Sequence, residues 1–512
     1  MPAVTAPRQS GIRRVLVANR GEIAVRIIRA CHEENLEAVA VYSDADALAA
    51  HVRAADRAVR IGAAPAAESY LHIGRLIEAA RGSDCQAIHP GYGFLSERAA
   101  FAEATTAAGL IFVGPTATAI QAMGDKTEAR RRILAAGVPV VPGSGGPVSD
   151  AGHAEREALR LGFPILLKAS AGGGGKGMRL VHQASELPSA LEAARGEALR
   201  AFGAGDVYVE KYLDRPRHIE IQVLGDSHGR IVAIGERECS VQRRHQKLIE
   251  EAPSVALSPA LRRRMSEAAV AAAGAVGYVG AGTVEFMLVG TQFYFLEMNT
   301  RIQVEHPVTE LVYGVDLVRE QLRIAAGSPM RVHGGSLQPR GHAIECRITA
   351  EDPFAGFLPA TGTLSYLRVP GGPGVRWDGG VESGSDITAY YDPLLAKLIV
   401  WGESREAAIE RMRRALGELV IVGVPTSQAF HLRVMDEPLF RRGEYDVTYL
   451  DRVGATLLPG APRPEVTRAL AVTAALLAEE RRVAPPVPLK SGQTPSHTSP
   501  WADAARQDAL RQ

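Results

Sequence analysis

Two acidic residues on either side of a predicted turn could bind a divalent cation. Glu285 and Glu297 lie in β-rich runs that flank Gly290, and this pattern predicts a hairpin. If the loop comprises residues 290–292, the two carboxylates lie directly opposite each other on one face. Carboxylates about 5 Å apart repel by roughly 3 kcal/mol at an effective dielectric near 20, and a bridging cation relieves that repulsion. Mg²⁺ favours one or two carboxylates plus substrate phosphates, so the spacing predicts a magnesium site.

A polar strip follows the second acid. Its members alternate with Met298, Ile302 and Val304, so an extended chain would place them on one face: Glu297, Asn299, Arg301, Gln303 and Glu305. A solvated strand face is the ordinary alternative. However, residues 293–296 resemble core, and 305–326 resemble one helix packed on that core. The pattern therefore favours a functional strip beside the metal.

A glycine loop at 172–177 formally matches the pattern G-x-G-x-x-G. A short apolar strand follows it instead of a helix, and Gly177 stands where a P-loop needs Ser or Thr, so both nucleotide-loop motifs fail. A flexible turn and a lid over phosphates remain open. Lys168, which ends an apolar strand just before the loop, favours the lid.

Other polar segments carry weaker signals. The charged run 236–247, taken alone, favours a solvated loop; it is short, of mixed sign and without aromatic residues, so it would bind nucleic acid poorly. His218 alternates with apolar residues on a strand, and both a structural role and a nucleotide contact stay open. Residues 89–93 form a rigid turn with no chemistry of their own. Cys239 is expected to be a packed thiol.

Several elements must position these residues. Alternating strands and helices over residues 11–125 predict an open, largely parallel α/β sheet. Residues 126–215 predict a small α+β unit, and strands resume from 216 to about 330. Within that stretch, Ser258 and Pro259 form an N-cap and N1 pair for a helix. Residues 341–450 predict more strands followed by a helix at 404–419, and the tail from 455 is expected to be largely disordered.

The composition fits a protein of several domains. The 512 residues suggest about three domains at roughly 150 residues each. A formal net charge of +1 gives no global field for nucleic acid or an anionic membrane. Four dispersed cysteines, the lack of an apolar signal segment and the lack of a membrane-length apolar run predict a soluble cytoplasmic protein.

Four motifs together resemble the biotin carboxylase component of biotin-dependent carboxylases, an ATP-grasp family. They are VANRGEIA at 17–24, HPGYGFLSE at 89–97, QRRHQK at 242–247 and EMNTRIQVEHP at 297–307. The resemblance covers residues 12–452 in order, and the set is far more specific than any one motif. It implies an α/β and α+β multidomain protein with an ATP-grasp fold. The implied parts are an N-terminal Rossmann-like domain at 11–125, an ATP-grasp domain at 126–330 with a mobile lid at about 140–215, and a C-terminal biotin carboxylase domain at 341–450.

The resemblance also implies a reaction. Such enzymes use ATP, two Mg²⁺ or Mn²⁺ ions and bicarbonate to form carboxyphosphate, which carboxylates biotin held on a carrier protein. Glu305 is implied as the base that deprotonates bicarbonate, and Arg347 as the cation that stabilises the biotin enolate. The implied bicarbonate contacts are Lys247, Arg301, Gln303 and Val304, and the implied metal ligands are Glu285, Glu297 and Asn299. The implied ATP contacts, besides Glu285 and Glu297, are Lys126, Lys168, Gly172, Gly173, Gly174, Gly175, Lys176, Gly177, Met178, Glu210, Lys211, Leu213, His218, Gln242 and His245.

The resemblance says less about the partner proteins and about the final acceptor of the carboxyl group. Carrier domains place their biotinylated lysine between methionines, whereas the only lysine after Lys397 is Lys490, which lacks them. A separate biotin carboxyl carrier protein and carboxyltransferase are therefore expected, with a homodimer implied by the resemblance. The simplest assembly is an acetyl-CoA or propionyl-CoA carboxylase, as in fatty acid biosynthesis. The alternatives are a pyruvate or urea carboxylase, a carbamoyl-phosphate-type ligase and a catalytically silent scaffold protein.

Overall fold

The computed structural model describes residues 11–169, 178–203, 205–332 and 337–458, with a few single positions beyond them. The chain divides into two units after Leu458, and the elements described below belong to the first of them. The glycine loop 172–177 and most of the tail lie outside the described residues, so the predictions for them stay predictions. Among the described helices, none combines the length and apolar character needed to cross a bilayer.

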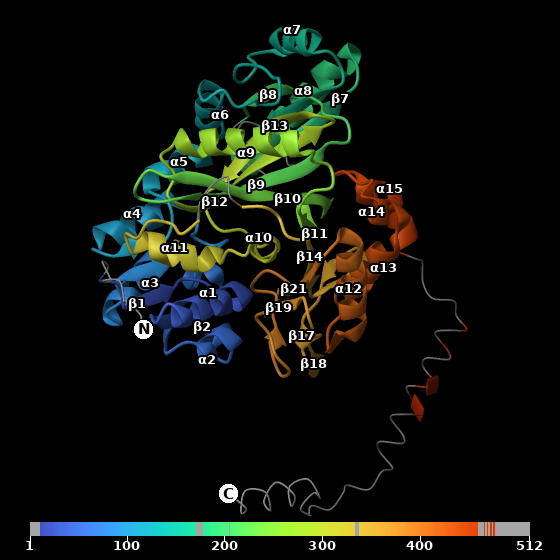
Figure 1. The fold of residues 1–512 in the computed structure, drawn as a ribbon. Coiled ribbons are helices and arrows are strands. Elements are labelled where there is room, and N and C mark those ends of the chain that lie inside the picture. Colours follow the sequence, from blue (N-terminus) through green and yellow to red (C-terminus); the bar gives the residue numbers. More distant parts are fainter. Residues whose placement is uncertain are drawn as a thin grey trace, which may run out of the picture. The chain divides into compact units, whose positions relative to one another are not determined.

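The N-terminal part is a parallel sheet with helices around it (Figure 1). Its strand order β3-β2-β1-β4-β5 places the first strand at the centre, as in nucleotide-binding α/β folds. The central strands are almost wholly buried, which explains their continuous apolar sequences. The elements are β1 (Arg14–Val17), α1 (Gly21–Glu33), β2 (Glu37–Ser43), α2 (Ala50–Ala54), β3 (Arg57–Gly62), α3 (Ile73–Gly82), β4 (Ala87–His89), α4 (Ala99–Ala107), β5 (Ile111–Phe112) and α5 (Ala117–Gly124).

A small antiparallel sheet follows, ordered β7-β6-β8, with α7 and α8 packed on it. Its apolar core contains Ile165, Leu167, Val207 and Val209. The predicted α+β unit is thus present, and β6 and β7 carry the residues on either side of the glycine loop. The elements are α6 (Lys126–Ala135), α7 (Ala151–Leu161), β6 (Ile165–Ala169), β7 (Met178–Val181), α8 (Leu187–Phe202) and β8 (Val207–Lys211).

The largest sheet has eight strands, ordered β13-β12-β9-β10-β11-β14-β21-β19. Helix α9 packs on one face, where Ile219, Ile221 and Val284 lie, and α10 and α11 pack on the other, where Leu224 and Ile234 lie (Figure 1). The elements are β9 (Arg217–Gly225), β10 (Ile231–Arg243), β11 (Gln246–Ala252), α9 (Pro259–Gly274), β12 (Gly280–Val289), β13 (Gln292–Asn299), α10 (His306–Tyr313), α11 (Leu317–Ala325), β14 (His342–Thr349), β19 (Val375–Gly379) and β21 (Leu394–Gly402).

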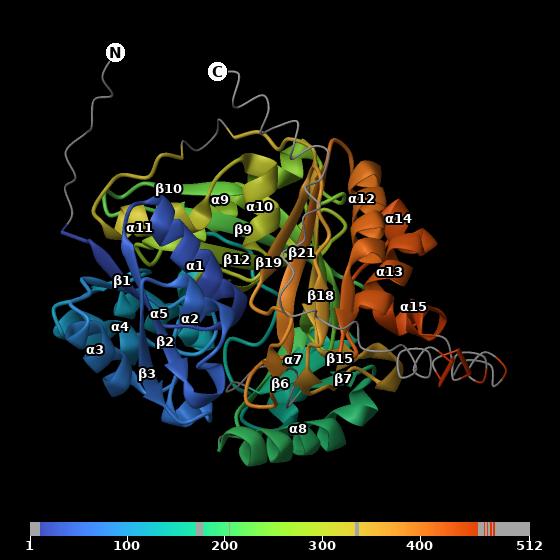
Figure 2. The same cartoon turned by 90° about the horizontal axis from the view of Figure 1, so that it is seen from below.

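The C-terminal part of this unit extends the same sheet. Helices α12 and α13 lie alongside β14 and β21 (Figure 2). Short strand pairs surround them: β15 (Glu351–Asp352) with β16 (Leu358–Pro359), β17 (Gly362–Thr363) with β20 (Asp386–Ile387), and β18 (Tyr366–Arg368) with β22 (Val420–Val422). The helices are α12 (Arg405–Glu418), α13 (Gln428–Asp436), α14 (Pro438–Arg442) and α15 (Tyr449–Leu457).

One predicted helix is two helices. The sequence pattern predicts a single helix over residues 305–326, but α10 ends at Gly314, which adopts a left-handed conformation with φ of 67°. Asp316 then caps α11 by accepting a hydrogen bond from the Arg319 amide. The single-helix prediction is wrong because a glycine C-cap and an aspartate N-cap occur two residues apart.

Candidate active site

The β12–β13 hairpin brings Glu285 and Glu297 opposite each other, as predicted. The loop that does this is not the predicted one, because Val289 pairs with Gln292 and only residues 290–291 lie between the strands. The register shifts between the Phe286–Phe295 pair and the Glu285–Glu297 pair, leaving Leu296 as an extra residue. The bulge restores the alignment that the shorter loop would have lost.

The two carboxylates have different surroundings. Glu285 is buried, whereas Glu297 is exposed and forms no side-chain hydrogen bond or ion pair with the described residues. Glu285 Oε1 accepts hydrogen bonds from Asn299 Nδ2 at 2.8 Å and Gln303 Nε2 at 2.7 Å, and Oε2 lies 2.8 Å from His218 Nε2. Although the residue as a whole is exposed, its carboxyl group lies mostly among protein atoms, so desolvation, together with the negative charge of Glu285, raises the pKa of Glu297.

This donor set fits a hard divalent cation. Glu285, Glu297 and Asn299 offer carboxylate and amide oxygens from one strand pair, which is the ligand chemistry that Mg²⁺ and Mn²⁺ prefer. The negative charge of Glu285 contributes to the raised pKa of Glu297, which shows that the two carboxylates repel each other. A bound cation would relieve this repulsion. The donor chemistry of these three residues is therefore compatible with a metal site.

Lys247 is the positive centre of the site. Its Nζ lies 2.6 Å from Glu220 Oε2, 2.9 Å from Glu285 Oε1 and 2.6 Å from Glu305 Oε1. Burial alone would lower the pKa of Lys247, but these three carboxylates outweigh it and raise the pKa well above its ordinary value. The ammonium is therefore charged at neutral pH, and it links Glu285 to Glu305.

Glu305 is held between two cations. Its second oxygen accepts a hydrogen bond from Arg347 Nη2 at 2.9 Å. Burial favours the neutral acid, yet Lys247, Arg347 and Arg237 together lower the pKa of Glu305 below its ordinary value. The carboxylate is thus ionised at neutral pH and able to accept a proton.

The sequence patterns did not identify Arg237. They predict a solvated charged loop over 236–247, but most of this run belongs to the buried strands β10 and β11, so that prediction is wrong. Arg237 is fully buried, and its guanidinium contacts five side chains: Glu220, Gln222, Thr283, Gln303 and Thr309. A buried arginine survives only with such complete pairing, so it fixes the neighbouring strands.

The polar residues of 297–305 do not form one face of a single strand, although several of them contact one another. β13 ends at Asn299, so the alternation expected through Glu305 fails beyond that point. Gln303 nevertheless reaches Glu285, and the Val304 carbonyl accepts a hydrogen bond from buried Lys397 at 2.8 Å. Arg301 turns to Glu97, with Nε 2.9 Å from Oε2, and also donates to Asn299 Oδ1. The segment 89–97, whose opening turn is predicted to carry no chemistry, therefore supplies the partner of Arg301.

The residues assigned to ATP by resemblance lie on several elements. Lys168 on β6 pairs with Met178 on β7, and its Nζ lies 2.5 Å from Glu210 Oε2 on β8. The Lys211 ammonium instead donates to the Gly162 carbonyl at 2.7 Å. Leu213 is half-buried just after β8, and exposed Lys126 begins α6.

Three further nucleotide candidates adjoin the hairpin of β10 and β11. His218 is buried against Glu285, whose charge outweighs desolvation and raises the pKa of His218. Buried Gln242 pairs with Lys247 across the strands. Arg244 and His245 form the turn, both exposed and both at positive φ, which is uncommon for non-glycine residues. Cys239 is a buried free thiol, as predicted.

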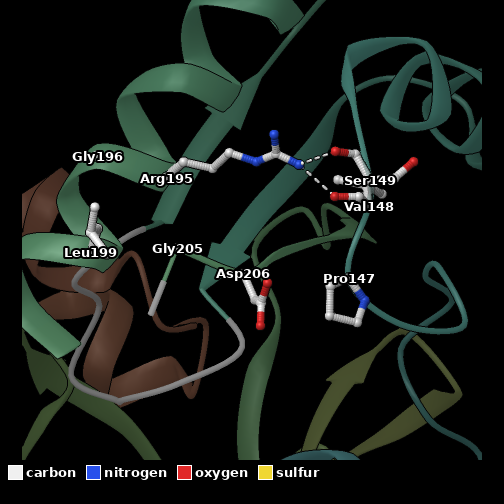
Figure 3. A pocket seen from close by; sticks show the side chains of 8 residues that line it. All are labelled: Pro147, Val148, Ser149, Arg195, Gly196, Leu199, Gly205 and Asp206. Atoms are coloured by element: carbon white, nitrogen blue, oxygen red, sulfur yellow. Dashed lines mark hydrogen bonds between the residues drawn. The ribbon is translucent and has the colours of Figure 1, made fainter. Parts of the chain in front are cut away.

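A separate pocket lies in the small-sheet unit (Figure 3). Its volume is about 470 Å³, and it is lined by Pro147, Val148, Ser149, Arg195, Gly196, Leu199, Gly205 and Asp206. Arg195 donates to the Val148 and Ser149 carbonyls, as the dashed lines show. The Arg195 guanidinium therefore binds backbone carbonyls. None of the residues that we assign to catalysis or to ATP lines this pocket.

Comparison with known proteins agrees with this geometry. Residues 11–120 match the family model of the biotin carboxylase N-terminal domain, residues 125–333 that of the carbamoyl-phosphate synthase L chain ATP-binding domain, and residues 345–452 that of the biotin carboxylase C-terminal domain. A pyruvate carboxylase component from Methanothermobacter thermautotrophicus is 52% identical, over 86% of this chain and 89% of its own. Biotin carboxylase of Nostoc sp. is 52% identical, over 86% of this chain and 99% of its own.

Solved structures give the same result. The biotin carboxylase domain dimer of Hydrogenobacter thermophilus 2-oxoglutarate carboxylase, in complex with MgADP, ADP and bicarbonate, superposes with a TM-score of 0.83 at 47% identity. The match covers 88% of this chain and 99% of that one.

Proposed function

The chain belongs to the biotin carboxylase family, and on that premise we propose how its residues share the ATP-dependent carboxylation of biotin by bicarbonate. The enzyme is a ligase that uses ATP, Mg²⁺ and a carrier-bound biotin, as its relatives establish. The observation that carries the assignment of roles is the placement of Glu305 between Lys247 and Arg347.

Glu305 is the general base. Bicarbonate is a poor nucleophile until its proton is removed, and an ionised carboxylate within a cluster of cations can remove it. Lys247 lowers the pKa of Glu305 but also stabilises the anion that forms beside it. Arg301, Gln303 and Val304 complete the bicarbonate contacts, with Glu97 orienting Arg301.

Arg347 stabilises the biotin enolate. Its Nη2 contacts Glu305 and its Nε lies 2.6 Å from Glu250 Oε1, so the guanidinium is shared between two acids. Once Glu305 has accepted the bicarbonate proton, that side of the guanidinium can turn to another anion. The oxygen of a biotin ureido group that has lost its N1 proton is such an anion.

Glu285, Glu297 and Asn299 would hold the divalent cation, and such a cation would neutralise the charge that spreads over the transferred phosphoryl group. Lys126, Lys168 and His218 are our candidates for the phosphate contacts, because each carries a basic side chain. Glu210, Lys211, Leu213, Gln242 and His245 complete the proposed nucleotide site. Lys211 would contribute through its backbone, because its ammonium already binds the Gly162 carbonyl. Closure of the loop 172–177 would then exclude water from carboxyphosphate.

The final acceptor is set by partners. We propose a homodimer that works with a biotin carboxyl carrier protein and a carboxyltransferase on other chains. An acyl-CoA carboxylase is one assembly, and pyruvate is equally compatible because a relative of high identity is named as part of a pyruvate carboxylase. Urea is a further alternative. Reconstitution with each carboxyltransferase would separate these acceptors.

The proposal is tested by ATP hydrolysis. Purified protein with MgATP and bicarbonate should hydrolyse ATP slowly, and free biotin should stimulate the rate. Ammonia in place of biotin should give no stimulation, whereas a carbamoyl-phosphate-type ligase would respond to ammonia. Absence of biotin stimulation at saturating bicarbonate and ATP would refute the assignment.

A further inference from the structure

Two buried glutamates behind Arg347 take no part in the roles above. Glu250 on β11 and Glu345 on β14 are directly opposite each other in the antiparallel register, and both are fully buried. Directly paired residues project to the same face with Cβ atoms about 5 Å apart. Arg347 lies two residues beyond Glu345 on that same face. The two acids and the arginine therefore form one compact group.

The hydrogen bonds of the two acids are unequal. Glu250 Oε1 binds the Arg347 guanidinium, with Nε and Nη2 both 2.6 Å away. Glu250 Oε2 and both oxygens of Glu345 have no hydrogen-bond partner among the described residues. An ionised carboxylate with no partner in a buried site costs several kcal/mol, so a folded protein keeps such a group neutral.

The surrounding charges point the same way. Three cations face this group: Arg347, Lys397 and Lys247. Lys397 already donates to the Val304 carbonyl and pairs with Glu22. Lys247 already contacts three other carboxylates. Glu305 adds a further negative charge beside Arg347. Desolvation raises the pKa of Glu250 to about 7 and that of Glu345 well above its ordinary value.

We infer that Glu250 and Glu345 share one proton, held on Glu345 and donated to Glu250 Oε2, and that this neutral acid keeps Arg347 positioned and available to an anion. Like-charged carboxyl pairs in other sites behave in this way, because both cannot ionise at short range. With both ionised, three carboxylates would surround Arg347, and the site would repel the bicarbonate and enolate anions. With one proton shared, Glu250 alone anchors the guanidinium while Glu305 changes its charge.

The inference rests on the proposed roles of Arg347 and Glu305 for its functional consequence, but its protonation state can be tested without turnover. Infrared difference spectra between the wild-type protein and Glu345→Gln at neutral pH should show loss of one carbonyl band of a protonated carboxyl group. Glu382→Gln, which removes an exposed acid, should lose no such band. If Glu345→Gln also loses none, Glu345 is ionised and the inference is overturned, whatever the activity.

The role of the two glutamates in positioning Arg347 can be tested separately, by measuring the activity of variants. Glu345→Gln replaces a neutral acid by a neutral amide, so biotin carboxylation should stay within about twofold of wild type at neutral pH. Glu250→Gln removes the charge that anchors Arg347 and should lower biotin carboxylation by about tenfold or more. Bicarbonate-dependent ATP hydrolysis without biotin should fall much less in that variant. Equal loss of both activities, or a large loss in Glu345→Gln, would contradict the role.

Discussion

Lys247 Nζ lies 2.6 Å from Glu305 Oε1 while also contacting Glu220 and Glu285. One ammonium group therefore neutralises the proposed base and a proposed metal ligand together. Because β11 carries Lys247 into the middle of the large sheet, the charge arrives from rigid backbone instead of a mobile loop. The site is organised in advance of substrate, which is the property that electrostatic catalysis requires.

Removing that charge should damage both stability and activity. Lys247→Met leaves three buried carboxylates each short of one partner, so the free energy of unfolding should fall by about 3 kcal/mol. Bicarbonate-dependent ATP hydrolysis should fall by about 10² or more. Urea denaturation and a steady-state assay measure the two effects. Lys247→Arg keeps the charge and should recover most of the stability; if Lys247→Met were as stable as wild type, the ammonium would not be the centre of the cluster.

Glu297 offers a clean test of the metal site, because its side chain has no hydrogen bond or ion pair with the described residues. Glu297→Gln should weaken Mn²⁺ binding in the presence of ADP by about tenfold or more, equivalent to about 1.4 kcal/mol. The metal-free protein should be no less stable, since the substitution also removes a charge beside Glu285. Mn²⁺ titration by electron paramagnetic resonance measures the affinity, with Glu382→Gln as control. Unchanged Mn²⁺ affinity would exclude Glu297 as a ligand.

Arg237 should be among the least replaceable residues of the chain. Arg237→Lys keeps the charge but cannot reach five partners on four segments, and should lower the free energy of unfolding by about 3–5 kcal/mol. Denaturant unfolding checks this. Arg263→Lys on the exposed side of α9 should be neutral within about 0.5 kcal/mol. Comparable midpoints for the two variants would show that the buried contacts contribute little.

Glu251 predicts a pH dependence of stability. Its carboxylate binds Arg405, His342 and Tyr445, and although burial opposes ionisation, Arg405 and His342 lower the pKa of Glu251. The unfolded value is about 4.3, so the contribution is fully present above that pH and is lost as pH falls through the folded value. The difference in unfolding free energy between wild type and Glu251→Gln should therefore be largest near pH 7 and shrink toward about pH 3. Exposed Glu406→Gln should show no difference at either pH; a gap that widens on acidification would contradict the assignment.

Local patterns located many elements but not their exact pairing. The helix predicted at 404–419 agrees with α12 (Arg405–Glu418), and Ser258 caps α9 through the Leu261 amide as expected. The Glu285–Glu297 alignment was also predicted, yet for a loop one residue too long. The bulge at Leu296 depends on pairing of β12 with β9 as well as β13, which a single strand's sequence does not specify.

The site was predictable where its residues are neighbours in sequence. Asn299, Gln303 and Glu305 follow Glu297 closely and share its spacing, so they were identified together. Arg237 binds side chains from residues 220 to 309, and Glu97 meets Arg301 from 204 positions away. Such contacts arise only after the domains fold, and a short charged run looks the same whether it is solvated or buried. The signal that could have identified Arg237 was the β-type alternation on either side of it.

The proposed mechanism depends above all on Glu305 as the base, and one substitution isolates that role. Glu305→Gln keeps the size of the side chain and its place between Lys247 and Arg347, but it cannot accept the bicarbonate proton. Bicarbonate-dependent ATP hydrolysis should therefore disappear while ATP affinity, measured by equilibrium binding, stays within about twofold of wild type. Retained bicarbonate-dependent turnover, or a large loss of ATP affinity, would contradict the role of Glu305 as the base.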